Sequence, residues 1–389
     1  MADPACSVDE HRSRVVEGVT RLAPEVVPLA DALGRRLAAD VVATLSVPPF
    51  DHAAMDGFAV RAADLASVPV SLPVSGAVAA GDTVTPLEPG TAVRIMTGAP
   101  VPPGADLVVP FEWTSGSDPV EIRQRADAGR HIRFEGEDVR AGDIAASAGS
   151  WLPPARLGLL ASVGATTVEV LARPRLGVIS TGAELVEGHV PDSNTVMLSA
   201  AGRDLGAVVT AYGPAPDDPG RFLDVLRTAA EHSDLVVTTG GISAGDHDVV
   251  KAALRDDPAF WFGPVALKPG RPQGCGSVVT SDGRRVPVVT LPGTPIAAYA
   301  AFHLFVRAVL GRLAGDDAET RLARLGVAVE AGDRTVVLPA VYDENDDAVP
   351  LRGHTGHSQR LLARAEALLV VPPARRTLAA GTVLEAFPL

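Results

Sequence analysis

Three apolar runs between residues 172 and 315 each stop at a glycine turn and lead into a helical pattern. The clearest run, residues 235–239, is rich in β-branched side chains and ends at Gly240-Gly241, before apolar residues return at helical spacing from position 249. Strands that alternate with helices are typical of a parallel sheet covered on both faces, with its turns collected on one edge. We therefore predict a three-layer α/β domain with a parallel sheet over residues 172–315.

The turns of this predicted domain supply the first candidate binding residues. The other two runs, residues 176–180 and 286–291, end in turns of the same kind. The predicted edge brings together Gly241, Ser243, Glu184 and Thr294. Glycine turns let backbone N–H groups approach an anion, and helix N-termini favour negative charge. Taken alone, Gly240-Gly241 is also explained as a tight turn, and Asp246 as a helix N-cap.

A second candidate for anion binding is the segment 268–272, Lys-Pro-Gly-Arg-Pro, which follows a strand predicted at 264–267. Lys268 and Arg271 lie on either side of a Pro-Gly turn and form a fork suited to phosphate oxygens. The alternative is that both are solvated surface cations, which the apolar flanks make less attractive. Cys275, close by, is interpreted as a packing residue and not as a nucleophile.

The chain before residue 172 contains a small linking region and an insertion. Ser7 and Glu10 have the spacing of a capping box, which predicts a helix over residues 8–22. Short helices are also predicted at 29–37 and 154–161, and strands at 41–44 and 166–171. Residues 8–45 and 144–171 are therefore predicted to form one linking α/β region.

Residues 46–143 are predicted to form an inserted β-rich domain. Strand-like runs occur at 70–78, 92–96, 107–109 and 120–122, separated by proline, glycine and aspartate. Asp56 precedes a glycine in a turn-forming pair, and Asp138 lies in a polar segment of mixed charge. By itself, either carboxylate fits a structural role in a turn as well as a functional one.

Residues 316–389 return to short strands, predicted at 325–329, 335–338, 368–371 and 383–386, with a short helix at 359–365. This end is predicted to be a small β-barrel-like domain, so that the whole chain is a multidomain α/β plus β protein. His354 and His357 are too isolated in the sequence to indicate a metal site.

Composition narrows the class of protein. The net charge of −13 argues against a general nucleic-acid binder, but it allows a small anionic ligand that needs only a few local cations. Cys6 and Cys275 have no paired spacing, which fits a reducing compartment and excludes a thiolate zinc site. The N-terminal residues lack an apolar signal core, and the apolar helix predicted at 297–313 is too short to span a bilayer. We expect a soluble cytoplasmic protein with no membrane or nucleic-acid partner.

Eight segments, in order along residues 8–388, resemble the MoeA family, the molybdopterin molybdenumtransferases, which also include the gephyrin E domain. Five carry most of the resemblance: PPFDHAAMDGFAVR (48–61), RIMTGAPVPPGAD (94–106), GED (136–138), PRLGVISTGAEL (174–185) and TTGGISAGDHD (238–248). Three more agree: KPGRP (268–272), LPGTP (291–295) and ARAEALLVVP (363–372). One such turn is a weak signal, whereas the ordered set is strong.

The resemblance implies an elongated, four-domain protomer that forms a homodimer, in part through the linking region. It also implies an activity, the insertion of molybdate into adenylylated molybdopterin with release of AMP. A divalent cation, expected to be Mg²⁺, would assist at the phosphoanhydride. Transient contacts with the molybdopterin adenylyltransferase and with acceptor molybdoenzymes would follow from this place in cofactor synthesis.

The resemblance also assigns roles to individual residues. Catalytic roles are expected for Asp56, Asp138, Glu184 and Asp248. Because hard cations prefer carboxylate oxygens, metal ligands are expected at Glu184, Asp246 and Asp248. Substrate contacts are expected at Thr97, Thr181, Gly182, Gly240, Gly241, Ser243, Lys268, Arg271, Pro292, Gly293 and Thr294. Asp56 and Asp138 are expected to close over the α/β site from the neighbouring domain or from the dimer mate.

Three positions depart from the family pattern. Thr294 stands where asparagine is usual, Arg271 where lysine is common, and His247 lies beside the acids. One alternative is therefore a diverged, gephyrin-like paralogue that acts as a dimeric scaffold. Another is a different enzyme on the same α/β domain, either an adenylyltransferase of the MogA type or a CinA-like hydrolase. The β-rich insertion argues against this second alternative.

Overall fold

The computed structural model describes residues 5–242, 248–315, 320–353 and 358–389. The chain forms two compact units, which are described separately. Unit 1 contains residues 1–23 and 172–389, and unit 2 contains residues 24–171.

A six-stranded sheet lies at the centre of unit 1, in the order β15-β14-β16-β20-β19-β17. The strands are β14 (Arg175–Ser180), β15 (Val208–Ala211), β16 (Leu235–Thr239), β17 (Phe260–Pro264), β19 (Pro272–Val279) and β20 (Arg285–Leu291). The first four in the order are parallel, and β19 and β17 are antiparallel to their neighbours. The predicted parallel α/β sheet is confirmed, whereas the predicted strand at 264–267 is wrong, because β17 ends at Pro264.

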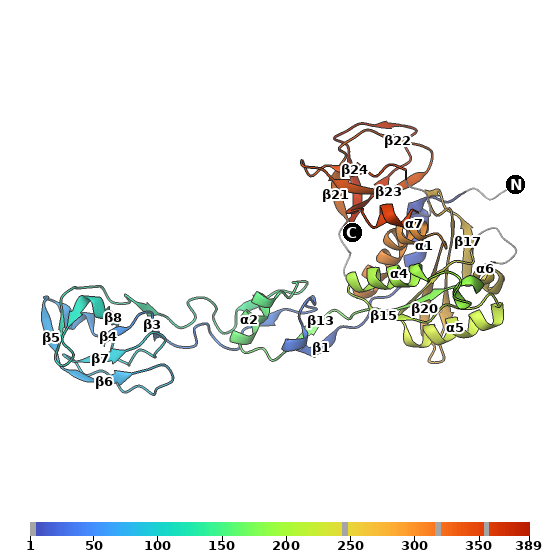
Figure 1. Cartoon of the computed structure of the whole chain (residues 1–389). Helices are drawn as coiled ribbons and strands as arrows, with labels where there is room; N and C mark the ends of the chain where they lie inside the picture. Colours follow the sequence, from blue (N-terminus) through green and yellow to red (C-terminus); the bar gives the residue numbers. More distant parts are fainter. Residues whose placement is uncertain (1–4, 243–247, 316–319, 354–357) are drawn as a thin grey trace. The chain divides into compact units, whose positions relative to one another are not determined.

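Helices cover both faces of this sheet, which completes the three predicted layers (Figure 1). One face packs against α1 (Val8–Val16), α4 (Ser193–Asp204), α7 (Pro295–Ala301), the π-helical segment η4 (Phe302–Val306) and α8 (Arg307–Ala314). The other face packs against α5 (Pro219–His232) and α6 (Val249–Leu254). Side chains alternate between the faces: Leu235 and Val237 join the first core and Val236 the second. Burial on both faces explains why the central strands are apolar throughout.

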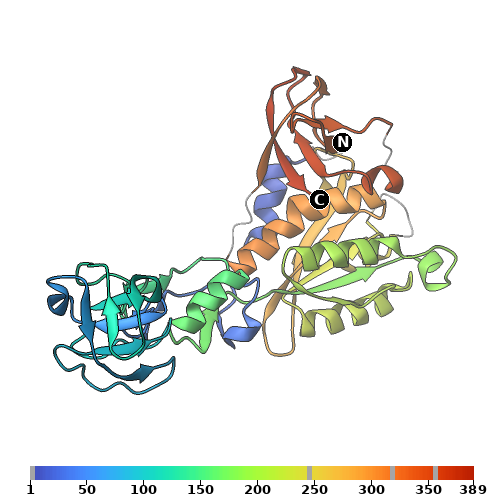
Figure 2. The ribbon, with the colours of Figure 1, turned by 60° about the vertical axis from the view of Figure 1, so that its left-hand side comes forward.

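The helix from Pro295 to Ala314 contains 20 residues. Figure 2 shows it as one unbroken orange ribbon. At 1.5 Å per residue it is about 30 Å long, so the expectation that it is too short to cross a bilayer is wrong. However, 72% of its most apolar window is buried inside the protein. Its apolar surface is therefore used in the core of unit 1.

The C-terminal part of unit 1 is a second sheet, in the order β18-β23-β25-β27-β21 with β24 beside β23. Its strands are β18 (Leu267–Lys268), β21 (Arg321–Arg324), β23 (Thr335–Tyr342), β24 (Ala348–Pro350), β25 (Ala367–Val371) and β27 (Val383–Pro388). A separate pair is formed by β22 (Val329–Ala331) and β26 (Arg376–Leu378). The helix of this region is α9 (Gln359–Leu362). A bridge between Leu325 and Ala348 links β21 back to β24, which makes the arrangement barrel-like, as predicted. The strand predicted at 325–329 is wrong, because the chain turns there between β21 and β22.

The linking part of unit 2 pairs β1 (Glu25–Pro28) with β13 (Thr167–Val170) and β2 (Val41–Val42) with β12 (Ile144–Ala146), beside α2 (Pro154–Ser162). The helix predicted at 29–37 is reduced to the 3₁₀ turn η1 (Leu29–Asp31), and Gly34 follows at φ +66°. The predicted N-terminal helix ends at Val16, six residues early, and packs within unit 1. Residues 8–23 therefore do not belong to the linking region, contrary to the sequence-based assignment.

The inserted part of unit 2 is β-rich, as predicted. A four-stranded sheet has the order β6 (Val74–Val78), β7 (Ala92–Ile95), β4 (Gly57–Val60) and β8 (Leu107–Pro110). A three-stranded sheet contains β5 (Val70–Leu72), β10 (Val120–Ile122) and β9 (Thr114–Ser115), and β3 (His52–Ala53) pairs with β11 (Ile132–Arg133). Short 3₁₀ turns are η2 (Ala62–Leu65) and η3 (Phe111–Trp113). The single strand predicted at 70–78 is divided at Pro73 into strands of two different sheets.

Candidate functional site

A cavity of about 810 Å³ lies where β14, β16 and β20 end in unit 1. It contains the turns that follow all three strands, at the edge where ligands of open α/β sheets bind. Nine residues predicted for the site line it: Thr181, Gly182, Glu184, Gly240, Gly241, Asp248, Pro292, Gly293 and Thr294. The predicted residues Ser243 and Asp246, and His247 beside the acids, lie outside the described residues, as do His354 and His357.

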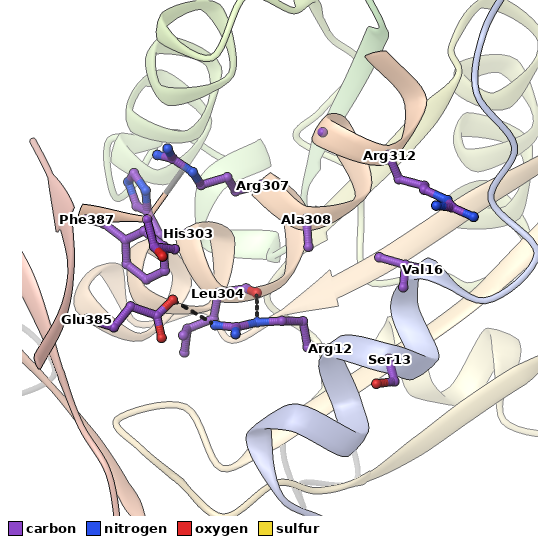
Figure 3. A pocket seen from close by; sticks show the side chains of 12 residues that line it. Arg12, Ser13, Val16, His303, Leu304, Arg307, Ala308, Arg312, Glu385 and Phe387 are labelled. Atoms are coloured by element: carbon purple, nitrogen blue, oxygen red, sulfur yellow. Dashed lines mark hydrogen bonds and ion pairs between the residues drawn. The ribbon is translucent and has the colours of Figure 1, made fainter. Parts of the chain in front are cut away.

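Two further cavities contain neither the strand-end turns nor the predicted site residues. One, of about 510 Å³, lies between α1, the helix of η4 and α8, and β27 (Figure 3). Within it the Arg12 guanidinium donates to the Leu304 carbonyl at 3.2 Å and pairs with Glu385 at 3.3 Å. The other, of about 820 Å³, is lined by Trp261 and Cys275. Burial raises the pKa of the Cys275 thiol to about 11, which supports its interpretation as a packing residue.

Backbone approaches backbone at the glycine turns of the 810 Å³ cavity. Gly240 has φ +94° and Gly241 has φ +65°, which other residues rarely adopt. A Cβ at Gly240 would lie 3.0 Å from the carbonyl oxygen of Thr181 and 2.9 Å from its Oγ1. The turns after β14 and β16 therefore touch, and only glycine fits at this position.

The carboxylates of the cavity come from four different helix starts. Glu184 lies in α3 (Ala183–Val186), and its Oε1 would be 2.6 Å from a Cβ at Gly182, so the carboxylate lies against that glycine. Asp248 is the half-buried N-cap residue of α6 and makes no capping hydrogen bond. Asp217 Oδ2 accepts from the Ala183 N–H at 3.0 Å, and Asp192 caps α4. Within the described ranges, no three metal-ligating side chains form a group that could hold an ion.

A hydrogen-bond network connects the strand ends. The Asn194 Nδ2 donates to Thr239 Oγ1 at 3.0 Å and to the Gly293 carbonyl at 2.7 Å. Thr239 Oγ1 donates to the Pro292 carbonyl at 3.0 Å. Asp192 Oδ2 accepts from Ser180 Oγ, and its Oδ1 accepts from the Thr195 N–H at 3.0 Å.

Sequence reasoning missed several residues of this cavity. Asp192 and Asn194 have a local signal, since they lie at a helix start between two of the glycine turns, but nothing local shows what they bind. Asp217 lies two residues before α5, in a segment to which we assigned no element. Gln359 comes from the C-terminal sheet region, and its Nε2 donates to Ser193 Oγ at 2.8 Å. No pattern in the sequence indicates that this residue reaches the cavity.

The Lys-Pro-Gly-Arg-Pro turn lies at the rim of the cavity. Gly270 and Pro272 line it, and the Gly270 carbonyl accepts from Gln273 Nε2 at 2.8 Å. Lys268, in β18, and Arg271 are exposed and do not line the cavity. The binding of phosphate by Lys268 and Arg271 therefore stays a prediction.

In unit 2, Asp56 and Thr97 form a compact pair. A Cβ at Gly57 would lie 2.0 Å from the Val109 carbonyl oxygen, so the turn residue after Asp56 must be glycine. Asp56 Oδ1 accepts from the Thr97 N–H at 2.7 Å and from its Oγ1 at 2.8 Å. These two donors, the N–H first, hold the pKa of Asp56 below its usual range, and the carboxylate stays ionised. Asp138 is exposed in a turn, and its own backbone N–H donates to the Val47 carbonyl.

Comparisons with known proteins cover nearly the whole chain. Three family models match in order: the MoeA N-terminal region (domain I and II) over residues 6–164, a probable molybdopterin binding domain over 177–312, and the MoeA C-terminal region (domain IV) over 323–389. Molybdopterin molybdenumtransferase 2 of Mycobacterium tuberculosis is 41% identical, over 98% of this chain and 99% of its own. Molybdopterin molybdenumtransferase 1 of the same species is 33% identical, over 97% and 98%. The crystal structure of a molybdopterin biosynthesis MoeA protein from Pyrococcus horikoshii has a TM-score of 0.83 at 30% identity and covers 99% of both chains.

Proposed function

This chain belongs to the MoeA family, and from that premise we propose that it inserts molybdate into adenylylated molybdopterin, releasing AMP and forming the molybdenum cofactor. The observation that carries the proposal is the cavity at the ends of β14, β16 and β20. Its glycine turns present backbone N–H groups to an anionic substrate, and a volume of about 810 Å³ suits a nucleotide-sized ligand. The scaffold alternative has no support, since the relatives matched over the whole chain are named as enzymes.

Charge in the cavity fits a phosphoanhydride substrate together with a hard cation. Glu184 and Asp248 would repel an anion if nothing lay between them and the phosphates. Mg²⁺ is commonly held by one or two carboxylates plus substrate phosphate oxygens, so these two residues fit it. When bound, the ion would neutralise charge that develops on the phosphate oxygens. Asp246, outside the described residues, is proposed as a further ligand.

The remaining predicted residues are given supporting roles in this proposal. Lys268 and Arg271 would reach the phosphates from the rim of the cavity, where Gly270 already lies. Thr181, Gly182, Gly240, Gly241, Ser243, Pro292, Gly293 and Thr294 would contact the substrate. In unit 2, Thr97 holds Asp56 ionised, and Asp56 and Asp138 are proposed to act in the same reaction.

We further propose that the protein is a cytoplasmic homodimer that passes its product to acceptor molybdoenzymes. The mass of one chain is 40.0 kDa, so light scattering should give about twice this value. A mass of one chain at micromolar concentration would contradict the dimer.

The experiment that tests the function follows AMP release when molybdate and Mg²⁺ are added to the protein and adenylylated molybdopterin. The wild-type protein should release AMP, whereas Glu184→Gln should bind the substrate and release none, because the amide removes the charge but keeps the shape. The matched control is Glu187→Gln, at the end of the same short helix but not lining the cavity, which should release AMP normally. An inactive wild-type protein would refute the function, and normal release by Glu184→Gln would refute the role of Glu184.

A further inference from the structure

Four side chains form a network that crosses three strand ends. We call Ser180, Asp192, Asn194 and Thr239 the strand-end network. Ser180 ends β14, Thr239 ends β16, and the carbonyls of Pro292 and Gly293 follow β20. Ser180 donates to Asp192, the N-cap residue of α4, and Asn194, two residues further on, reaches the other two strand ends. All of these residues line the 810 Å³ cavity.

The direction of the hydrogen bonds at Asn194 is fixed by their acceptors. The Gly293 carbonyl can only accept, so the amide nitrogen of Asn194 must face it, at 2.7 Å. The same nitrogen lies 3.0 Å from Thr239 Oγ1, which then uses its own proton for the Pro292 carbonyl at 3.0 Å. Both consecutive carbonyls of the Pro292-Gly293 turn are thus held, one directly and one through Thr239.

This orientation leaves Asn194 Oδ1 buried with no hydrogen-bond partner in the described chain. A buried acceptor without a partner is unfavourable and is rare in native proteins. The reversed amide would place Oδ1 against the Gly293 carbonyl oxygen, which is worse. The Asn194 amide therefore makes two donations, to Thr239 Oγ1 and to the Gly293 carbonyl, while its own oxygen has no partner in the described chain.

The turn that Asn194 holds is joined to the adjacent glycine turn by a backbone hydrogen bond. The Gly240 N–H donates to the carbonyl of Leu291, directly before Pro292, at 3.1 Å, and Gly240 in turn lies close to Thr181. A shift of the Pro292-Gly293 turn would therefore move the backbone of the adjacent glycine turn, because closely packed backbone cannot absorb it.

We propose that Asn194 is a positioning residue of the site: its amide sets the spacing between the Gly240-Gly241 and Pro292-Gly293 turns at which adenylylated molybdopterin is bound. This inference rests on the proposed function for the identity of the substrate. Asn194 acts through the turns and not on the reacting atoms. Its loss should therefore weaken binding of substrate and transition state alike, which raises KM and leaves kcat nearly unchanged.

The first variant is Asn194→Asp, which keeps the shape but replaces the donor with a second acceptor facing the Gly293 carbonyl. Calorimetry with adenylylated molybdopterin should show at least about tenfold weaker binding. In AMP release, KM should rise by a similar factor while kcat stays within about threefold. Binding as tight as that of the wild-type protein would overturn the inference, and so would a loss confined to kcat.

The second variant, Thr239→Val, removes the hydroxyl that carries the hydrogen bond to Pro292 with little change of shape. If Asn194 acts through Thr239, the double variant Asn194→Ala/Thr239→Val should lose clearly less affinity than the product of the fold-losses of the two single variants. A fold-loss in the double variant equal to that product would contradict the network. The matched control is Thr238→Val on the same strand, whose hydroxyl is buried with no partner in the described chain and lies outside the cavity lining. This control should bind like the wild-type protein.

Binding is measured without turnover, so the two proposals can fail separately. A wild-type protein that binds the substrate but releases no AMP contradicts the proposed function, while the Asn194 comparison still decides the inference. If Asn194→Asp does not fold, Thr239→Val alone decides it: weaker binding supports the network, and unchanged binding overturns it.

Discussion

At the scale of single residues, backbone geometry explains more of this site than side-chain chemistry does. A Cβ at Gly57, in unit 2, would overlap the Val109 carbonyl oxygen, and a Cβ at Gly240, in unit 1, would be crowded by the Thr181 carbonyl oxygen at 3.0 Å. Two of the predicted catalytic carboxylates have contacts within such turns: Glu184 lies against Gly182, and Asp56 accepts a hydrogen bond from Thr97. The glycines recognised in the sequence are therefore steric requirements of the turns.

Replacing Gly240 by alanine should reduce substrate binding. The new Cβ would lie 3.0 Å from the Thr181 carbonyl oxygen, and φ +94° is strained for alanine, so both turns must shift. We expect at least tenfold weaker binding of adenylylated molybdopterin by calorimetry. Gly188→Ala is the matched control, since it has φ +73° but open space around it. It should lose roughly 1–2 kcal/mol of stability and keep its affinity. Equal affinities in the two variants would contradict the steric argument.

Two buried histidines make unit 1 sensitive to acid. Burial, and secondarily Arg307, lowers the pKa of His303 to about 4; burial, and secondarily Arg14, lowers the pKa of His11 to about 3. An unfolded histidine has a pKa of about 6.5, so below that pH the unfolded chain takes up protons that the folded chain does not. The free energy of unfolding should therefore fall as pH decreases from about 6.5 towards 4.

The variant His303→Phe isolates this effect. Phenylalanine can replace the ring contacts with Tyr299 and Phe387, and it does not titrate. Between pH 6.5 and 5 the wild-type protein should lose about 1.5 kcal/mol more stability than the variant, because the slope reaches its full value of about 1.36 kcal/mol per pH unit only well below pH 6.5. Urea unfolding of unit 1 at both pH values measures the difference. Parallel losses in the two proteins would show that His303 is protonated in the folded state.

At the scale of elements, the sequence signals around α1 located the start of the helix better than its end. The capping box of α1 is formed as the spacing predicts: Glu10 N–H donates to Ser7 Oγ at 3.1 Å, and Ser7 N–H donates to the Glu10 carboxylate at 2.6 Å. The helix nevertheless ends at Val16, two residues before Gly18 at φ +72°. Val19 and Leu22 continue the helical period but lie beyond the end of the helix, where Val19 is buried and Leu22 is half-buried against the core of unit 1. Periodicity reports burial, and it does not by itself report helix.

Removal of this cap should weaken unit 1 measurably. Ser7→Ala leaves the first-turn N–H of Glu10 without its acceptor, and we expect a loss of about 1 kcal/mol in the free energy of unfolding. Ser13→Ala, at an exposed position within the same helix, is the control and should be neutral or slightly stabilising, because alanine is the better helix former. Thermal or urea unfolding compares the two. An unchanged free energy of unfolding in Ser7→Ala would mean that the cap contributes nothing.

At the scale of the whole molecule, unit 2 is an insertion whose two ends meet. Glu25 of β1 pairs with Val170 of β13 in antiparallel register, so the chain leaves and returns at neighbouring positions. Its core is separate from the cores of unit 1. The catalytic acids predicted from the sequence are divided accordingly, with Asp56 and Asp138 in unit 2 and the others in unit 1.

This division predicts that the units can be separated. Deleting residues 24–171 and joining the flanking residues with a short Gly-Ser linker should leave a folded unit 1, because the deletion crosses no strand pair of its sheets. The fragment should bind adenylylated molybdopterin within about tenfold of the full chain by calorimetry, and it should release no AMP, since Asp56 and Asp138 are gone. Undiminished AMP release would show that unit 2 is not needed for the chemistry.

The sequence by itself determined the strands that are buried on both faces and the turns that must be glycine. β14, β16 and β20 are continuous apolar runs, and backbone sterics restrict what can follow them, so both features depend on neighbouring residues alone. Parallel strands also place their carboxyl ends on one edge, which was enough to predict that Glu184, Gly241 and Thr294 meet in one cavity.

Only the tertiary structure decided what joins those turns to each other. Asn194 binds Thr239, 45 residues away, and Gly293, 99 residues away, while Gln359 reaches Ser193 across 166 residues. It also decided that α1 packs on unit 1 and that β17 and β19 run antiparallel to their neighbours. Contacts of this kind depend on how sheets and helices are oriented after they form, and no residue type or spacing within a short window encodes that orientation.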